Sequence, residues 1–132
     1  MTRSKKPGKT PWRGEIWWVS LDSTLGAEIR KTRPCVVLSI DLVNRHRETA
    51  VIVPLSSSPS AHPPIRVSVT CDGQPSVAVV DRIRGVSKSR LQRRLADASP
   101  DDMAAIESAL KRILALGYGS GWVGDTARSG RT

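Results

Sequence analysis

The chain has 132 residues, a formal net charge of +9 and a sequence pI of about 10.6. This length predicts a single domain, and the basic balance favours an anionic partner, with nucleic acid first among the candidates. No apolar run approaches the ~20 residues that cross a bilayer, and the basic N-terminus lacks the apolar segment of a secretory signal. Cys35 and Cys71 form no CxxC motif, and His46 and His62 have no metal-site spacing. We therefore expect a reduced, cytoplasmic protein that uses no metal or other cofactor.

The composition of both chain ends predicts flexible segments. Residues 1–12 are basic, polar and proline-containing, and residues 119–132 are rich in Gly, Ser and Arg. Such segments cannot bury enough apolar surface to fold. We therefore expect one folded domain over residues 13–118.

Short strands are predicted over most of this domain, from β-branched and aromatic residues, short apolar runs and period-two alternation. The predicted strands are Glu15–Val19, Cys35–Leu38, Thr49–Pro54, Ile65–Thr70, Ser76–Ile83 and Arg94–Ala96. Ser39–Asn44 predicts a brief helical turn with Ser39 as its N-cap. Asp72-Gly73 predicts a turn between two of the strands.

One amphipathic helix is predicted after the last strand. Ser99 is its expected N-cap, Pro100 suits the first helical position, and Gly117 is the expected C-cap. The apolar residues of one face are Met103, Ile106, Leu110, Ile113 and Leu114. That stripe indicates core packing rather than a cofactor site. Short strands followed by a terminal helix predict a mainly β fold, a small twisted barrel.

The candidate chemistry comes from arginines and hydroxyl groups, because the common nucleotide-loop, zinc and nucleophile-elbow motifs are absent. Arg33 stands between an extended backbone and the start of a strand, where a guanidinium can grip a phosphate bidentately. The alternative is a solvated edge arginine. Ser56 and Ser57 follow the strand Thr49–Pro54, where strand-end hydroxyls often face a groove. The alternative here is a serine loop that caps its own backbone.

A further cluster surrounds Ile83. Alternation along a strand would place Asp81 and Ile83 on one face and Arg82 and Arg84 on the other, where the two arginines could contact phosphates. The alternative is a surface strand with scattered, weak ion pairs. A basic run that could add salt-sensitive phosphate affinity follows, made of Lys88, Arg90, Arg93 and Arg94.

Five segments between about Arg13 and Leu116 occur in a specific order and spacing. They are Arg13-Gly14-Glu15-Ile16-Trp17-Trp18-Val19, Gly26-Ala27-Glu28, Lys31-Thr32-Arg33-Pro34 with the strand to Leu38-Ser39, Val53-Pro54-Leu55-Ser56-Ser57, and Val80-Asp81-Arg82-Ile83-Arg84. Together they resemble the MazF/PemK toxins, the endoribonucleases of type II toxin–antitoxin systems. The fourth segment is similar to the family's Pro-x-Thr-Ser stretch, and the fifth to its Asp-Gln-x-Arg/Lys stretch.

The resemblance implies a small SH3-like barrel of the CcdB/MazF type that homodimerises. It also implies a metal-independent endoribonuclease that cuts single-stranded RNA at short sequences and has an acidic, MazE-like antitoxin as partner. Arg33 matches the family's catalytic arginine. Ser56 stands where the family has a catalytic threonine, which keeps the hydroxyl but loses the methyl that restrains χ1. The residues implied to bind RNA are Glu28, Lys31, Thr32, Ser57, Asp81, Arg82 and Arg84.

The hypothetical mechanism uses the RNA's own 2′-hydroxyl as nucleophile. Arg33 would stabilise the added negative charge, and Ser56 would hold a phosphate oxygen or orient the 2′-hydroxyl. No residue stands out as the general base. Base recognition is expected from the Asp22–Arg30 and Ser57–Pro64 loops.

Two other classes of function stay open at this point. A gyrase-inhibiting toxin can share the same barrel, because fold does not fix function. A nucleic-acid-binding module without catalysis also suits the charge and the scarcity of aromatic residues, and the residues alone favour it. A groove shared by Arg33 and Ser56 would favour the nuclease, whereas separation of the two would favour the inhibitor.

Overall fold

The computed structural model describes residues 10–21, 31–57, 62 and 65–117. The strands in this part of the chain are β1 (Glu15–Ser20), β2 (Thr32–Val37), β3 (Thr49–Ser56), β4 (Arg66–Cys71), β5 (Gln74–Val79), β6 (Arg84–Ser87) and β7 (Leu91–Asp97). The helices are α1 (Asp41–His46) and α2 (Pro100–Leu114), with short 3₁₀ turns η1 (Val80–Arg82) and η2 (Lys88–Arg90). No helix in these segments is long and apolar enough to cross a membrane.

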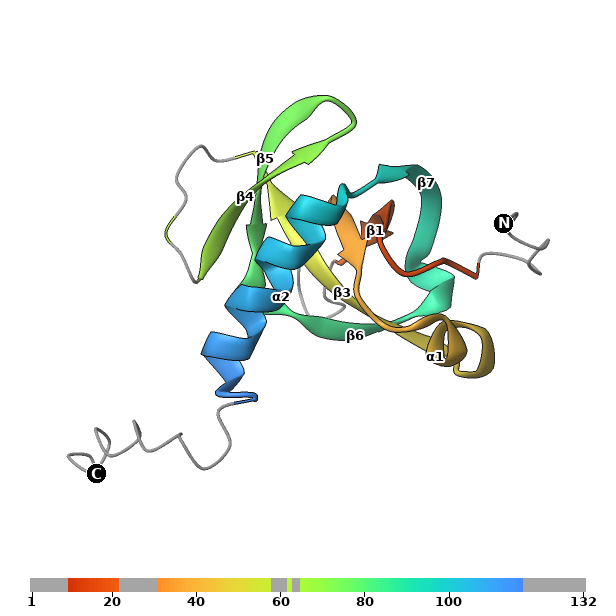
Figure 1. Cartoon of the computed structure of the whole chain (residues 1–132). Helices are drawn as coiled ribbons and strands as arrows, with labels where there is room; N and C mark the ends of the chain where they lie inside the picture. Colours follow the sequence, from red (N-terminus) through yellow and green to blue (C-terminus); the bar gives the residue numbers. More distant parts are fainter. Residues whose placement is uncertain (1–9, 22–30, 58–61, 63–64, 118–132) are drawn as a thin grey trace.

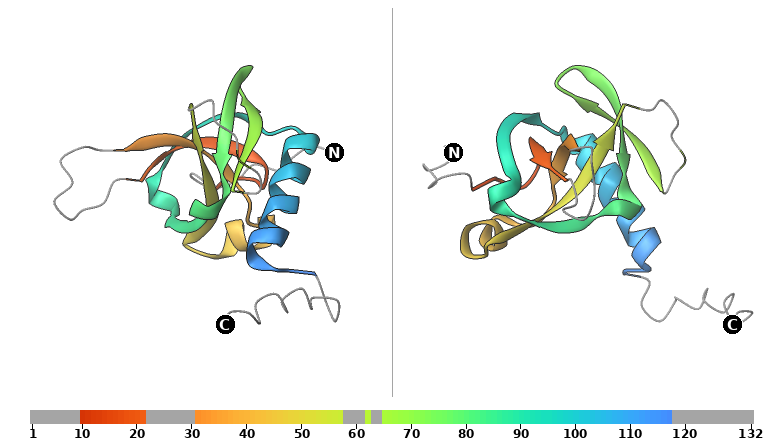
Figure 2. Two further views of the ribbon diagram at one scale, coloured as in Figure 1. Left: turned by 90° about the vertical axis from the view of Figure 1, so that its left-hand side faces the viewer. Right: turned by 180° about the vertical axis from the view of Figure 1, so that it is seen from behind.

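The strands form one curled antiparallel sheet in the order β4-β5-β3-β2-β1-β7 (Figure 1). β3 is its central strand, because it pairs with β2 and β6 along its first part and with β5 at Leu55 and Ser56. The helix α2 lies across one side of the sheet, and β1 and β2 run side by side away from it (Figure 2). The predicted fold class, a small mainly β barrel with a C-terminal helix, is confirmed.

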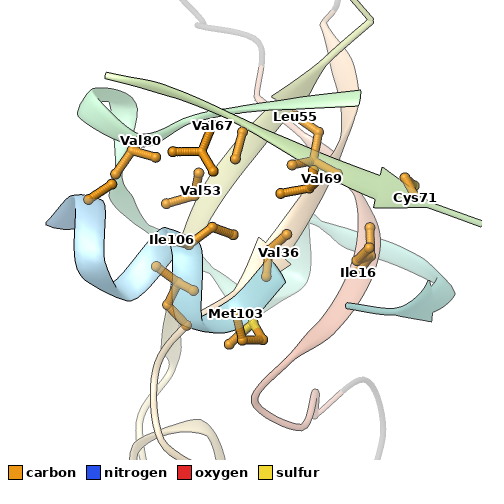
Figure 3. Packing of buried hydrophobic residues seen from close by; sticks show 13 residues of the cluster. Ile16, Val36, Val53, Leu55, Val67, Val69, Cys71, Val80, Met103 and Ile106 are labelled. Carbon is orange, nitrogen blue, oxygen red and sulfur yellow. The ribbon is translucent and has the colours of Figure 1, made fainter. Parts of the chain in front are cut away.

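Alternation along the strands divides the core into two clusters, since successive strand residues face opposite sides. The first cluster lies under α2 and joins Ile16, Val36 and Val53 to Met103 and Ile106 of the helix (Figure 3). The second lies on the other face of β1, β2 and β3. It contains Trp17, Val19, Cys35, Val37, Ile52, Val86 and Leu91.

The helix α2 begins as predicted. The Ser99 hydroxyl accepts a hydrogen bond from the Asp102 backbone N–H at 3.0 Å, and Pro100 follows in the first turn. The Asp102 carboxylate in turn accepts a hydrogen bond from the Thr70 N–H at 2.8 Å, which ties the helix start to β4. The helix end differs from the prediction. Ala115, with φ of 56°, is the C-cap, two residues before Gly117, and Leu114 is 49% exposed rather than packed on the core.

The prediction of one continuous strand over Ser76–Ile83 is wrong, because η1 interrupts this segment. β5 ends at Val79, and a new strand, β6, begins at Arg84. β5 pairs with the end of β3, whereas β6 pairs with the beginning of β3. The chain must therefore turn between two places on the same strand, which a continuous strand could not do.

The predicted N-cap at Ser39 is also wrong. The N-cap of α1 is Ile40, and it makes no side-chain capping bond. The Ser39 hydroxyl instead donates to Asn44 Oδ1 at 2.5 Å and accepts from the Val51 N–H at 2.9 Å. Ser39 therefore fastens the connection between β2 and β3 to the sheet rather than capping the helical turn.

Several elements extend beyond their predicted bounds. β2 begins at Thr32 and β3 continues to Ser56, so Arg33 and Ser56 both belong to strands. Thr10 and Pro11 are buried, so the packed part of the chain starts before residue 13. The predicted tail, residues 119–132, lies outside the described residues.

Candidate active site

A groove of about 320 Å³ opens where β3 changes partners. Its lining comes from the ends of β1 and β2, from β3, and from the β4, β5, η1 and β6 side. The lining residues are Leu21, Lys31, Arg33, Pro54, Leu55, Ser56, Arg66, Val79, Arg82 and Arg84. The groove therefore combines strand ends that are far apart in the sequence.

Arg33 and Ser56 face this groove because of the β2–β3 register. The pairing of these two strands ends at Cys35 opposite Pro54. Arg33 and Ser56 each lie two residues beyond that pair and thus on the same faces as Cys35 and Pro54. Ser56 pairs instead with Val77 of β5, so β3 leaves β2 where the two side chains emerge. The divergence of the strands leaves the space between them.

The opposite wall carries three more arginines. Arg66 starts β4 and pairs with Val79 of β5. Arg82 ends η1, and Arg84 begins β6 and pairs with Ile52 of β3. The break in the predicted strand is what brings Arg82 and Arg84 to the groove, because η1 carries the chain back from β5 toward the start of β3.

The groove is strongly cationic. Among the residues that the structure describes, its lining includes Lys31 and four arginines and no carboxylate. Within the described part of the chain, none of these five side chains makes a hydrogen bond or an ion pair. Like charges this close repel one another, and a bound anion relieves that repulsion. The geometry is that of an anion-binding groove.

Several cations outside the groove have partners within the protein. Arg13 pairs with Glu107 at 2.5 Å and donates to the Leu38 carbonyl at 3.0 Å. The predicted basic run also serves the barrel itself. Lys88 donates to the Asn44 carbonyl at 2.7 Å, and Arg90 donates to the Ser20 carbonyl at 3.1 Å. Arg94 pairs with Glu15 at 3.1 Å and with Asp97 at 2.9 Å. Arg93 lies over the Trp18 ring, 5.9 Å from its centroid. These five cations therefore stabilise the barrel and are distinct from the set in the groove.

Cys35 lies beneath the groove on the same face of β2 as Arg33. Burial raises the pKa of its thiol from 9.0 to about 12, although Arg84 and Arg33 act in the opposite direction. The thiol is therefore neutral near pH 7 and a poor nucleophile. Its role is packing in the second core cluster.

Most of the predicted site residues that the structure describes come together in the groove. Lys31, Arg33, Ser56, Arg82 and Arg84 line it. The predicted RNA-binding residues Thr32, Ser57 and Asp81 are exposed but are not among the lining residues, and Glu28 lies outside the described residues. The described segments contain no group of three or more His, Cys, Asp or Glu that could hold a metal ion.

Arg66 is a groove residue that the sequence did not indicate. Its one signal is a cation at the start of the alternating strand Ile65–Thr70. Its place opposite Arg33 depends on the neighbouring strands β5 and β3, which no local pattern reveals.

Comparison with known proteins identifies the family. The family model of the "PemK-like, MazF-like toxin of type II toxin-antitoxin system" matches residues 12–114. Endoribonuclease MazF9 of Mycobacterium tuberculosis is 34% identical over 113 residues, which cover 79% of this chain and 96% of the relative. Endoribonuclease EndoA of Bacillus subtilis is 27% identical over 109 residues, 79% of this chain and 94% of the relative.

Solved structures agree with the sequence comparisons. An endoribonuclease in complex with its cognate antitoxin, from a mycobacterial species, superposes with a TM-score of 0.66 at 25% identity, covering 83% of this chain and 97% of that one. A MazE–MazF structure from Deinococcus radiodurans shares the fold, with a TM-score of 0.72 at 24% identity over 82% of this chain and 98% of that one. The chain belongs to the PemK-like, MazF-like toxin family of type II toxin–antitoxin systems.

Proposed function

We propose that this chain is a toxin that cleaves single-stranded RNA in the cationic groove. The observation that carries the proposal is the convergence of five cations without partners among the described residues on one groove that also contains the Ser56 side chain. Relatives named endoribonucleases support the reaction class. A groove of this charge suits the phosphate backbone of RNA.

The proposed reaction uses the nucleophile that RNA carries. The 2′-oxygen attacks the adjacent phosphorus and loses its proton, while the bond from phosphorus to the 5′-oxygen breaks and that oxygen gains a proton. The products are a 2′,3′-cyclic phosphate and a 5′-hydroxyl. Arg33 stabilises the negative charge that builds up on the phosphate oxygens, because a guanidinium can donate two parallel hydrogen bonds to them. Ser56 positions the same phosphate from the neighbouring strand.

Metal-independent chemistry follows from the charge of the groove. Lys31 and the four arginines supply the positive charge that a divalent cation supplies in many nucleases. The same side chains would repel a divalent cation that approached the phosphate. The protein's own lysine and arginine side chains therefore stabilise the negative charge of the phosphate.

The proposed partner is an acidic, MazE-like antitoxin. An acidic segment would compete with RNA for the groove cations through the same charge complementarity. A relative of the same fold has been solved with its cognate antitoxin. We place the toxin domain at residues 13–118, with the buried Thr10 and Pro11 just before it. The proposed toxin is a homodimer that acts in the cytoplasm, where the free thiols of Cys35 and Cys71 would stay reduced.

The decisive assay incubates the purified protein with a mixed single-stranded RNA pool in excess EDTA. We expect discrete cleavage products that end in a 2′,3′-cyclic phosphate, at the same rate when Mg²⁺ replaces EDTA. A folded sample that cuts no RNA in either buffer would contradict the proposal. Salt-sensitive binding without products would indicate the non-catalytic module, and neither binding nor cutting would favour the gyrase-inhibitor class.

Substitutions at Ser56 test the role of its hydroxyl. Ser56→Thr keeps the hydroxyl and restricts χ1, so we expect activity within a few-fold of the wild type. Ser56→Ala removes the hydroxyl, and we expect kcat to fall by about 10²-fold, as for loss of one transition-state donor. Single-turnover cleavage of one RNA by both variants makes the comparison. Equal activity of the two variants would remove Ser56 from the mechanism.

A further inference from the structure

We propose that Arg66 binds a second phosphate of the RNA, next to the one held by Arg33 and Ser56. The groove would then bind the backbone of at least three successive nucleotides, since two neighbouring phosphates join three. This inference rests on the proposed function and adds a subsite to it. Nothing in the sequence motifs assigns a role to Arg66.

The sheet places Arg66 apart from the scissile position. Arg33 is on β2 and Arg66 is on β4, and the sheet order puts β3 and β5 between those strands. Three strand spacings of ~4.8 Å give roughly 14 Å along the sheet, less across the curl. The two arginines therefore enter the same groove from opposite walls. A phosphate held between Arg33 and Ser56 leaves Arg66 to the neighbouring phosphate.

Arg66 is held more firmly in place for phosphate binding than the exposed arginines of the same groove wall. Its N–H donates to the His62 carbonyl at 2.9 Å, and its own carbonyl accepts from the His62 N–H at 3.0 Å. It also pairs with Val79. Its backbone is thus fixed on both sides, and it is half buried, whereas Arg82 and Arg84 are exposed. A partly ordered side chain loses less conformational entropy when it binds.

Chemistry also favours an anionic ligand at this position. Within the described residues, the Arg66 guanidinium has neither a hydrogen-bond acceptor nor a carboxylate partner. A half-buried guanidinium without an acceptor is costly, and a phosphate oxygen satisfies two of its N–H groups at once. The nearest anion that the proposed substrate offers is the phosphate beside the scissile one.

The test uses an RNA pentanucleotide that spans the cleavage site mapped with the wild-type protein. A 2′-deoxy substitution at the attacking nucleotide prevents cleavage, and in a series one phosphate at a time is replaced by a neutral methylphosphonate. Dissociation constants are measured by fluorescence anisotropy for the wild type, for Arg66→Gln, and for Arg112→Gln, which removes the same charge from the exposed end of α2.

We expect Arg66→Gln to weaken binding about 10-fold, as for one charged hydrogen-bonded contact, and Arg112→Gln to bind like the wild type. Neutralising one non-scissile phosphate should weaken wild-type binding by a similar factor but Arg66→Gln hardly at all. On the cleavable RNA, Arg66→Gln should raise KM about 10-fold and leave kcat within about 2-fold. A merely structural role would not single out one phosphate.

Three results would overturn the inference. In the first, Arg66→Gln binds the RNA as tightly as the wild type. In the second, Arg66→Gln weakens binding by the same factor whichever phosphate is replaced by a methylphosphonate. In the third, the loss of binding disappears only when the scissile phosphate is replaced, and kcat falls as well. Failure of the proposed function has a different signature, because the wild-type protein would then cut no RNA at all, and the inference would fall with it.

Discussion

Arg33→Ala is expected to lower kcat on single-stranded RNA by about 10²-fold or more. Arg33 lies in the groove beside Ser56 and has no ion-pair partner among the described residues, so its charge is available to the phosphate. Alanine removes both donors of the bidentate contact while β2 keeps its pairing with β1. Single-turnover cleavage at saturating protein measures the chemical step directly.

Arg112→Ala is the matched control for this variant. Arg112 is exposed on the last turn of α2, so the change in net charge is the same and the groove is untouched. Wild-type activity of Arg112→Ala would show that the Arg33 effect is local. Full activity of a folded Arg33→Ala protein would refute the role assigned to Arg33.

The largest stability effect is expected from Glu15→Ala, at about 3 kcal/mol lost from the free energy of unfolding. Glu15 is only 3% exposed. Its carboxylate accepts hydrogen bonds from the Trp12 N–H at 2.8 Å, from Trp17 Nε1 at 3.0 Å and from Arg94 Nε at 3.1 Å. Alanine removes the acceptor of all three donors. Urea unfolding followed by tryptophan fluorescence gives the difference.

Arg94→Gln provides the comparison, because it disturbs one of the three contacts and leaves both tryptophan donors with their acceptor. The Arg94 side chain is also 46% exposed, and exposed ion pairs contribute little. We expect a loss of about 1 kcal/mol or less. If Glu15→Ala unfolds at the same urea concentration as Arg94→Gln, then the carboxylate is not the structural centre that its contacts indicate.

Local signals in the sequence were enough to predict the start of α2 and the turn between β4 and β5. Ser99 caps the helix with its own side chain, and that geometry depends only on neighbouring residues. Asp72 and Gly73 both have positive φ, as a tight hairpin turn requires. The pairing of Cys71 with Gln74 across them follows from the turn. Elements of this kind are encoded within a few residues.

The interruption at η1 could not be predicted in the same way. The apolar run from Val77 to Val80 is typical of a buried strand and contains no turn signal. The break is imposed by β3, which receives β5 at one end and β6 at the other. Arg66 was missed for a related reason. Its position in the groove depends on β5 lying between β4 and β3, a consequence of tertiary pairing.

The net charge of the sequence also does not show which cations face the groove. Arg94 finds Glu15 at a separation of 79 residues, and Arg90 finds the Ser20 carbonyl at a separation of 70. Net charge and composition alone do not distinguish these cations from Arg33 and Arg84. Only the fold separates the arginines that hold the barrel together from those that face the groove, so charge alone overestimates the RNA-binding surface.

The proposed mechanism requires Arg33 and Ser56 to hold the same phosphate in the groove. A crystal structure of the protein with the 2′-deoxy pentanucleotide tests this requirement most directly. We expect the phosphate that follows the deoxynucleotide to lie within hydrogen-bond distance of both the Arg33 guanidinium and the Ser56 hydroxyl. An RNA bound on another face of the barrel, or a scissile phosphate that contacts neither side chain, would contradict the account.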